Sequence, residues 1–213
     1  MNNIQLFLTS TLLFLTSISS AQDNSLSFFV TSIGPGNGAD LGGLTGADAH
    51  CQMLATTAGA GNKNWRAYLS TVSTNNQAAV NARDRIGQGP WYNAKGVRIA
   101  QNLNDLHSTN NKLSKTNSID EKGNIINGFG DKPNRHDILT GSTKNGMASN
   151  EAGDTTCSNW QNSGKGSALV GHHDRMGGNN RISWNSAHGS FGCSQEKLKI
   201  TGGNGYFYCF SAD

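Results

Sequence analysis

Four cysteines constrain what this chain can fold into more than any other feature. They are Cys51, Cys157, Cys193 and Cys209. Their number is even and none belongs to a Cys-x-x-Cys pair, so the pattern favours disulfide bonds over a zinc knuckle. Disulfides persist in oxidising compartments, so this interpretation depends on whether the chain is exported. Four cysteines permit three pairings, and their spacing does not choose among them.

The N-terminus predicts export. Residues 4–18 form an apolar and hydroxyl-rich run, and Ser19-Ser20-Ala21 follows it as a small-residue cleavage site. This order is typical of a secretory signal peptide cut after Ala21. A run of about 15 residues is shorter than the roughly 20 that a membrane span needs, and no second apolar run follows. We therefore expect a signal peptide at 1–21 and a secreted, extracellular or cell-surface protein, as in bacterial export, without a membrane span.

Composition excludes several classes of protein. The formal net charge is +3, only 15% of residues are charged, and 16 residues are aromatic (8 Phe, 4 Trp and 4 Tyr), which together exclude disorder driven by charge. Glycine is frequent at 27 residues, but it has no three-residue period and only 3 prolines accompany it, which excludes collagen. The basic residues are scattered, so we expect no nucleic-acid partner.

The order of patterns indicates one α+β domain over residues 22–213. Aromatic and β-branched runs predict strands at 26–32, 65–70 and 206–210. Between the first two, Thr45-x-x-Asp48 resembles a capping box and begins an apolar helical face that ends at Gly59. Residues 101–136 are polar and lack periodicity, which is typical of a long functional or poorly ordered loop.

Six sequence blocks, in this order, carry a family resemblance. They are Gly43 to Cys51, Trp65 to Ser70, Gly89 to Trp91 with Gly96 to Ile99, Thr140 to Gly146, Thr156 to Trp160, and Tyr208 to Phe210. Together they resemble the endostatin domain of the collagen family, a variant of the C-type lectin-like fold. Bacterial secreted proteins of the lectin type share the pattern, including C-terminal domains of bacterial collagen-like adhesins. The resemblance covers nearly all of the mature chain.

The resemblance implies both a fold and a function. The fold would be α+β and loop-rich, with a mixed or antiparallel sheet, one main helix, paired first and last strands, and nested disulfides Cys51 to Cys209 and Cys157 to Cys193. The function would be that of a secreted, non-enzymatic module for adhesion, lectin-like in its carbohydrate binding. Its partner would be a glycan, a glycosaminoglycan or another matrix polysaccharide or protein.

A comparison with the calcium ligands of C-type lectins predicts calcium-independent binding. These lectins carry a Trp-Asn-Asp triplet before the third cysteine, and here Trp184-Asn185-Ser186 stands before Cys193, with Ser186 in place of the carboxylate. Their Glu-Pro-Asn triplet is also missing, since Lys132 precedes Pro133. Calcium prefers six to eight oxygen ligands with carboxylates among them. We expect no cofactor, and we expect Trp184 to belong to the core.

Ionisable side chains concentrate in three segments of the C-terminal half. The candidate ligand-binding residues are His136, Asp137, His172, Asp174, Arg175, Asn185 and His188. Convergence of three such side chains would allow zinc, and with it a metal-dependent exported enzyme. His172 and His173 are adjacent on a predicted strand and point to opposite faces, so at most one serves a single site. In the competing interpretation these residues hydrogen-bond loop backbone.

A second candidate surface is a weak arginine patch for polyanions. It would consist of Arg66, Arg83, Arg85 and Arg98, because guanidinium groups bind sulfate and carboxylate in bidentate fashion. The alternative is that these arginines are solvated or pair with Asp84. The sequence contains no Gly-x-Ser-x-Gly or His-Glu-x-x-His motif, so we assign no catalytic residue. A structural oligomerisation module is the remaining alternative.

Overall fold

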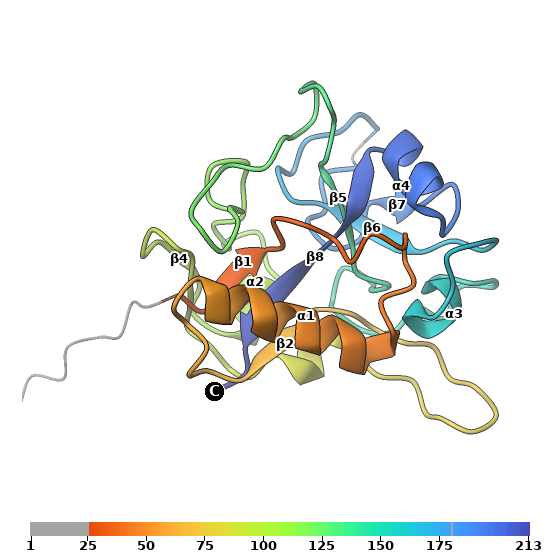
Figure 1. Ribbon diagram of the computed structural model, residues 1–213, viewed down its shortest axis with the longest axis horizontal. Helices are drawn as coiled ribbons and strands as arrows, with labels where there is room; N and C mark the ends of the chain where they lie inside the picture. The colour runs from red at the N-terminus through yellow and green to blue at the C-terminus, as the bar shows by residue number, and fades with distance from the viewer. Residues whose placement is uncertain (1–25, 180) are drawn as a thin grey trace, which may run out of the picture.

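The central strand of the main sheet is β8 (Gly203–Ser211) in the computed structural model, which describes residues 26–179 and 181–213. β1 (Phe28–Val30) and β2 (Trp65–Ala67) pair with β8 in antiparallel fashion, and β5 (Asp137–Leu139) pairs with it in parallel (Figure 1). The first and last strands are therefore neighbours, as the resemblance implies. The predicted signal peptide at 1–21 lies outside the described residues.

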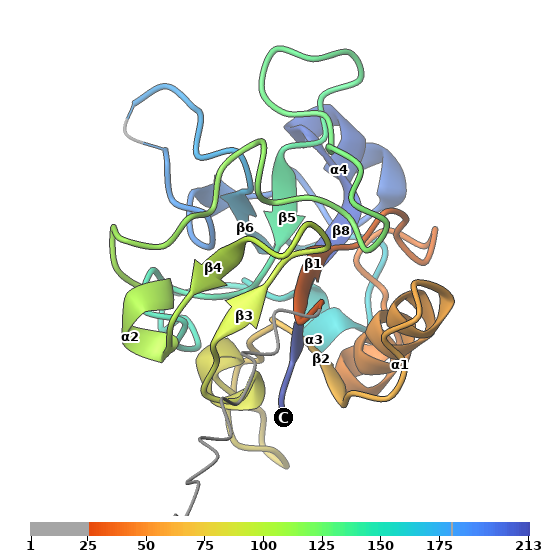
Figure 2. The same ribbon diagram turned by 90° about the vertical axis from the view of Figure 1, so that its left-hand side faces the viewer.

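Two further strands extend the sheet beyond β5. β6 (Leu169–His172) is antiparallel to β5, and β7 (His188–Gly189) is antiparallel to β6. The sheet is thus mixed, and the fold is α+β, as the sequence predicts. A separate two-stranded sheet, β3 (Trp91–Tyr92) with β4 (Arg98–Ala100), lies beside β1 (Figure 2), where the amide of Ser27 donates to the Tyr92 carbonyl at 2.8 Å.

The main helix, α1 (Gly43–Thr57), lies across β2 and β8 (Figure 1). Its buried face comprises Ala47, Cys51, Leu54 and Ala55, which confirms the predicted apolar stripe. The predicted capping box is wrong. The helix begins two residues before Thr45 with Gly42 as its N-cap, and the Asp48 carboxylate instead accepts from the Ala67 amide of β2 at 2.9 Å.

Shorter helical segments occur in the connections between the strands. They are the 3₁₀ turn η1 (Ala82–Arg85), α2 (Leu103–Leu106) and α4 (Gln195–Thr201). The segment α3 (Cys157–Trp160) is a turn with left-handed backbone, because all four residues have φ between 49° and 67°. Such a run is rare for residues other than glycine, and side chains hold it: the Trp160 indole donates to the Ser70 carbonyl, and Asp154 accepts from two amides of the turn.

Alternation along β8 divides the core into two layers. Phe207 and Cys209 face α1, together with Trp65 and Trp160. Tyr208 and Phe210 face the other way, where an aromatic layer with Phe28, Tyr68, Trp91 and Trp184 fills the second face. Trp184 is only 4% exposed, which agrees with its predicted place in the core.

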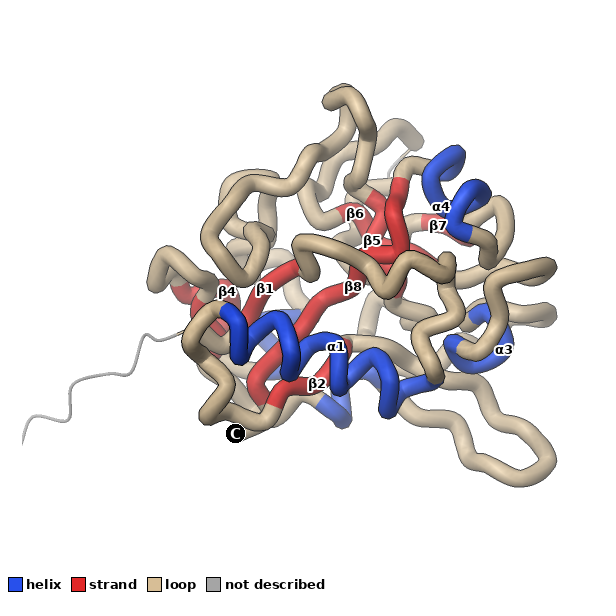
Figure 3. Tube along the Cα trace, viewed as in Figure 1, coloured by secondary structure: helices blue, strands red, loops and turns tan. Residues whose placement is uncertain are grey.

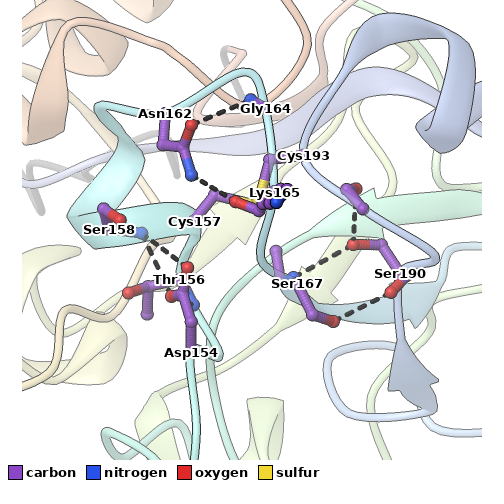
Figure 4. Close-up of a disulfide and its surroundings, with 12 residues drawn as sticks. Asp154, Thr156, Cys157, Ser158, Asn162, Gly164, Lys165, Ser167, Ser190 and Cys193 are labelled. Carbon is purple, nitrogen blue, oxygen red and sulfur yellow. Dashed lines mark hydrogen bonds between the residues drawn. A yellow bond between two sulfur atoms is a disulfide. The ribbon is translucent and has the colours of Figure 1, made fainter.

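Both disulfides have the nested pairing that the resemblance implies. Cys51 of α1 is bonded to Cys209 of β8, and Cys157 to Cys193, at sequence separations of 158 and 36. The inner bond lies among loop residues that hydrogen-bond one another (Figure 4): Ser167 Oγ donates to the Ser190 carbonyl at 2.9 Å, and the side-chain amide of Asn162 donates to the Lys165 carbonyl. The outer bond fastens helix to sheet, and the inner bond fastens loops to one another.

Loops form a large part of the described chain (Figure 3). Residues 101–136 contain α2 and otherwise irregular structure, yet Leu106, Leu113 and Ile126 are buried and cover the aromatic layer. The segment is therefore a packed cover for one face of the sheet. Within the described residues, no helix has the length and apolar character needed to cross a membrane.

Candidate functional site

Strand register brings the predicted histidines together at one end of the sheet. Asp137 is the first residue of β5 and lies opposite His172, the last residue of β6, while His188 of β7 lies opposite Val170. Residues opposite one another, and diagonal neighbours two positions along, share one face of an antiparallel pair. Asp137, His172 and His188 therefore point to the same side, and His136, which directly precedes β5, stacks its ring on His172 at 4.0 Å between centroids.

The centre of this histidine cluster (His136, Asp137, His172 and His188) is one carboxylate oxygen. Asp137 Oδ1 lies 3.2 Å from His136 Nε2, 3.3 Å from His172 Nε2 and 3.6 Å from His188 Nε2. The Nε2 atoms of His172 and His188 are themselves 2.9 Å apart. Three ring nitrogens thus converge on one acid group, as the sequence interpretation required for zinc.

The outer ring nitrogens of the cluster contact oxygen atoms. His172 Nδ1 donates to the Met176 carbonyl at 2.7 Å, and His188 Nδ1 donates to the Gly189 carbonyl at 3.0 Å. His136 Nδ1 lies 3.4 Å from Asp174 Oδ1. Because a carbonyl oxygen can only accept, His172 and His188 each carry a proton on Nδ1, and Nε2 of each ring is directed at the centre.

Asp174 lies beside the ring nitrogen of His136 that does not face Asp137. Its carboxylate accepts from the Phe129 and Met176 amides at 2.5 and 3.0 Å. Burial opposes ionisation of this group, but His136 and the two amides stabilise the charged form, and together they hold the pKa of Asp174 well below its usual range. The predicted ligand residue Asp174 is therefore an ionised partner of a cluster histidine and not a member of the centre.

The histidine cluster is largely buried. His136, Asp137 and His172 are 4%, 3% and 2% exposed, whereas His188 closes the cluster on the side nearest solvent. Burial alone would lower the pKa of His172, but the Asp137 carboxylate, 3.3 Å from its Nε2, favours the charged ring and outweighs burial, so the pKa is raised. The site therefore favours a positive charge between the imidazoles and the carboxylate.

His173 lies on the opposite face, as the strand alternation predicts. It is fully buried, its Nε2 donates to the Asn127 carbonyl at 3.1 Å, and burial lowers its pKa. This histidine serves the packing of the 101–136 segment and takes no part in the histidine cluster.

Two predicted ligand residues, Arg175 and Asn185, belong to a neighbouring hollow instead. We call it the Trp184 groove, a cavity of about 300 Å³ lined by His107, Ser108, Thr109, Lys144, Arg175, Ile182, Ser183, Trp184 and Asn185. Five of these residues come from the loop between His172 and His188, whose described residues, 173–179 and 181–187, lie beyond β6 in Figure 2. The structure thus divides the predicted ligand set between two adjoining sites.

The Trp184 groove carries positive charge. Lys144 and Arg175 line it, and none of the nine lining residues is acidic. Two of the lining residues are joined through the Tyr68 hydroxyl. Asn185 Nδ2 donates to this hydroxyl at 2.9 Å, and the hydroxyl donates to His107 Nε2 at 2.8 Å. Burial lowers the pKa of His107, and the charge of Arg83 adds to this effect, so the ring is neutral near pH 7.

Two of the four arginines of the predicted patch form ion pairs within the protein. Arg66 Nη1 and Arg85 Nη2 contact Asp48 at 3.0 and 2.8 Å, so the two arginines share one carboxylate, which offsets one of their two positive charges. Arg83 donates to the Asn145 carbonyl, and Arg98 is exposed on β4. Asp84, the partner considered from the sequence, instead accepts from Asn81 at 2.8 Å.

Most of the groove lining, including Lys144 and His107, has no signal in the sequence. Lys144 lies inside one of the resemblance blocks, but nothing in the residue pattern marks its side chain as lining a groove. His107 follows an Asn102 cap whose side chain accepts from the Asp105 amide, a local signal for a short helix but not for a binding site.

Comparisons with known proteins leave the family open. No protein-family model matches the sequence. No curated protein matches it either.

Proposed function

We propose that the protein is a secreted, non-enzymatic binding module with a C-type lectin-like, endostatin-like fold, and that it takes an acidic saccharide in the Trp184 groove. The observation that carries the proposal is the cationic lining of this groove, with Lys144 and Arg175 unopposed by any acidic lining residue. A lysine and an arginine suit a carboxylate or sulfate group on a sugar.

The nested disulfides and the β1–β8 pairing support the fold part of the proposal. For the partner, the amide of Asn185 and the hydroxyls of Ser108, Thr109 and Ser183 place neutral hydrogen-bonding groups beside the two cations. Such a mixture suits a polar ring that carries one anionic substituent. Secretion remains part of the proposal, with both disulfides as its support.

The alternative of a metal-dependent enzyme has less support. A catalytic metal keeps an open position for substrate, but three of the four cluster residues are 4% exposed or less. An oligomerisation module predicts a stable multimer by light scattering, which the binding proposal does not require.

Retention on immobilised heparin at low salt tests the proposal. We expect folded wild-type protein to be retained and to elute as salt screens the contact. Lys144→Gln with Arg175→Gln should weaken retention about 10-fold, as expected for the loss of two charge-assisted contacts. Lys95→Gln with Arg98→Gln removes the same two charges from exposed positions at the β3–β4 hairpin and is the matched control. Absence of retention, or an equal loss in the control, would contradict the proposal.

A further inference from the structure

A buried carboxylate without hydrogen bonds lies at the middle of the histidine cluster. Asp137 is 3% exposed, and neither of its side-chain oxygens receives a hydrogen bond within the described structure. An ionised carboxylate in such a place needs a compensating positive charge. The compensating group is either a proton on an imidazole or a bound cation.

The distances from Asp137 Oδ1 to the three imidazoles are those of a tetrahedral metal site. Zinc bonds of about 2.0–2.2 Å to nitrogen and oxygen place the ligand atoms of a tetrahedron roughly 3.3–3.6 Å apart. The Nε2 atoms of His172 and His188, 2.9 Å apart, would therefore have to separate by about 0.4 Å around the ion. The three Nε2 atoms lie 3.2, 3.3 and 3.6 Å from Asp137 Oδ1. The donor atoms of His136, Asp137 and His172 also lie within 4.8 Å of one another.

The outer contacts of the imidazoles are those of metal-binding histidines. Such histidines donate their second N–H to a backbone carbonyl or a carboxylate, which fixes the ring and the tautomer. Here the Met176 and Gly189 carbonyls accept from His172 and His188, and Asp174 Oδ1 lies 3.4 Å from His136 Nδ1, close enough to orient that ring by its charge. With Nδ1 of each ring donating outward, Nε2 of His172 and Nε2 of His188 form a hydrogen bond of 2.9 Å, which requires one proton between them. A metal ion at the centre would take the place of that proton.

We propose that His136, Asp137 and His172 bind a zinc ion through Nε2, Oδ1 and Nε2, and that His188 completes the coordination through Nε2 from the solvent side. Three imidazoles and one carboxylate form a donor set that suits zinc and its neighbours among the first-row transition metals. Calcium is excluded by the same donors, because it requires six to eight oxygens. The site is distinct from the Trp184 groove, and its test does not depend on the saccharide.

The ion would have a structural role. Four protein donors fill a tetrahedral zinc ion and leave no position for substrate, which is the pattern of structural sites. His172 and His188 stand at the two ends of the loop 173–187, so one ion bound to both closes the base of that loop. Closing a loop in this way removes conformational freedom from the segment that lines the groove.

Zinc titration of the full mature chain tests the proposal. After removal of metals with a chelator and dialysis, we expect the wild-type protein to take up one zinc ion per chain. His172→Gln and Asp137→Asn should lower the affinity at least 100-fold, because each removes a ligand. Asp174→Asn should lower it about 10- to 100-fold, the usual effect of losing a group that orients a ligand.

His50→Ala is the matched control, since this histidine contacts the Ile33 carbonyl on another part of the chain. Circular dichroism and thiol titration establish that each variant is folded with both disulfides. If a ligand variant does not fold, cobalt added to the wild-type protein gives a second readout, because tetrahedral cobalt absorbs strongly in the visible range. Folded wild-type protein that binds no zinc, or zinc binding that survives His172→Gln unchanged, would overturn the proposal.

Discussion

The Nε2 atoms of His172 and His188 lie 2.9 Å apart, although the two residues are separated by 16 positions in the sequence. Both residues lie on one face of the sheet, because β6 pairs with β7, and both donate from the outer ring nitrogen to a backbone carbonyl. The two inner nitrogens share one proton in a hydrogen bond beside the Asp137 carboxylate. This relationship makes the end of the sheet a place for a cation, and it links that cation to the loop that builds the Trp184 groove.

Zinc should stabilise the folded protein. A ligand that binds only the native state at 100 times its dissociation constant adds about 2.7 kcal/mol to the free energy of unfolding. We expect an increase of this size when zinc is added to chelator-treated wild-type protein, and none in His172→Gln. Urea unfolding with and without zinc measures it, and an equal increase in both proteins would contradict a role for this site.

Gly171→Ala should disturb both the loop and the cluster. A Cβ atom at this position of β6 would lie 1.8 Å from the Trp184 carbonyl oxygen and 2.4 Å from the Asn185 amide. Backbone atoms cannot yield cheaply, so we expect a loss of about 1–3 kcal/mol in unfolding free energy together with weaker zinc binding. Gly178→Ala in the same loop is the control, because no atom lies within 4 Å of its added Cβ.

Asp48→Asn should destabilise the packing of α1 on the sheet. The carboxylate lies between Arg66 and Arg85 and accepts from the Ala67 amide, so its loss leaves two guanidinium groups without their shared counter-ion. Removing one partner of a largely buried ion pair costs about 3 kcal/mol. Chemical denaturation measures this loss. The exposed Asp84→Asn should change stability by less than about 0.5 kcal/mol, and similar losses in the two variants would show that the network contributes little.

His107 should make stability depend on pH. Burial lowers its pKa in the folded protein below the ordinary value of 6.5. Above that pH both states are neutral and the residue contributes nothing. As the pH falls below 6.5, His107 binds a proton in the unfolded chain but not in the folded chain, so the free energy of unfolding falls.

His107→Asn should therefore flatten the decrease in unfolding free energy as the pH falls below about 6.5. The comparison is made in chelator, so that metal release does not contribute to either slope. Equal slopes for the variant and the wild-type protein would show that His107 does not titrate as described.

Local and covalent features of the fold were predictable from the sequence. The apolar face around Cys51 and Leu54 follows from residue spacing, and the pairing of Cys51 with Cys209 follows from the family resemblance. The start of α1 was not predictable, because Asp48 has a stronger tertiary partner in Arg85 than it would have as a helix cap. Tertiary ion pairing overrides the local capping signal here.

The candidate site was predictable in its residues but not in its grouping. Histidine density identified His136, His172 and His188, and strand alternation separated His172 from His173. The division between cluster and groove depends on the register of β5, β6 and β7, which irregular loops of different lengths connect. No local pattern specifies that register, so Arg175 and Asn185 were grouped with the histidines.

Anomalous diffraction from zinc-soaked crystals of the protein, recorded on both sides of the zinc absorption edge, tests the central claim most directly. The account predicts one strong peak bonded to His136 Nε2, Asp137 Oδ1 and His172 Nε2 at about 2.0–2.2 Å, with His188 as the fourth ligand. No peak at the cluster, with zinc bound elsewhere or not at all, would contradict the account.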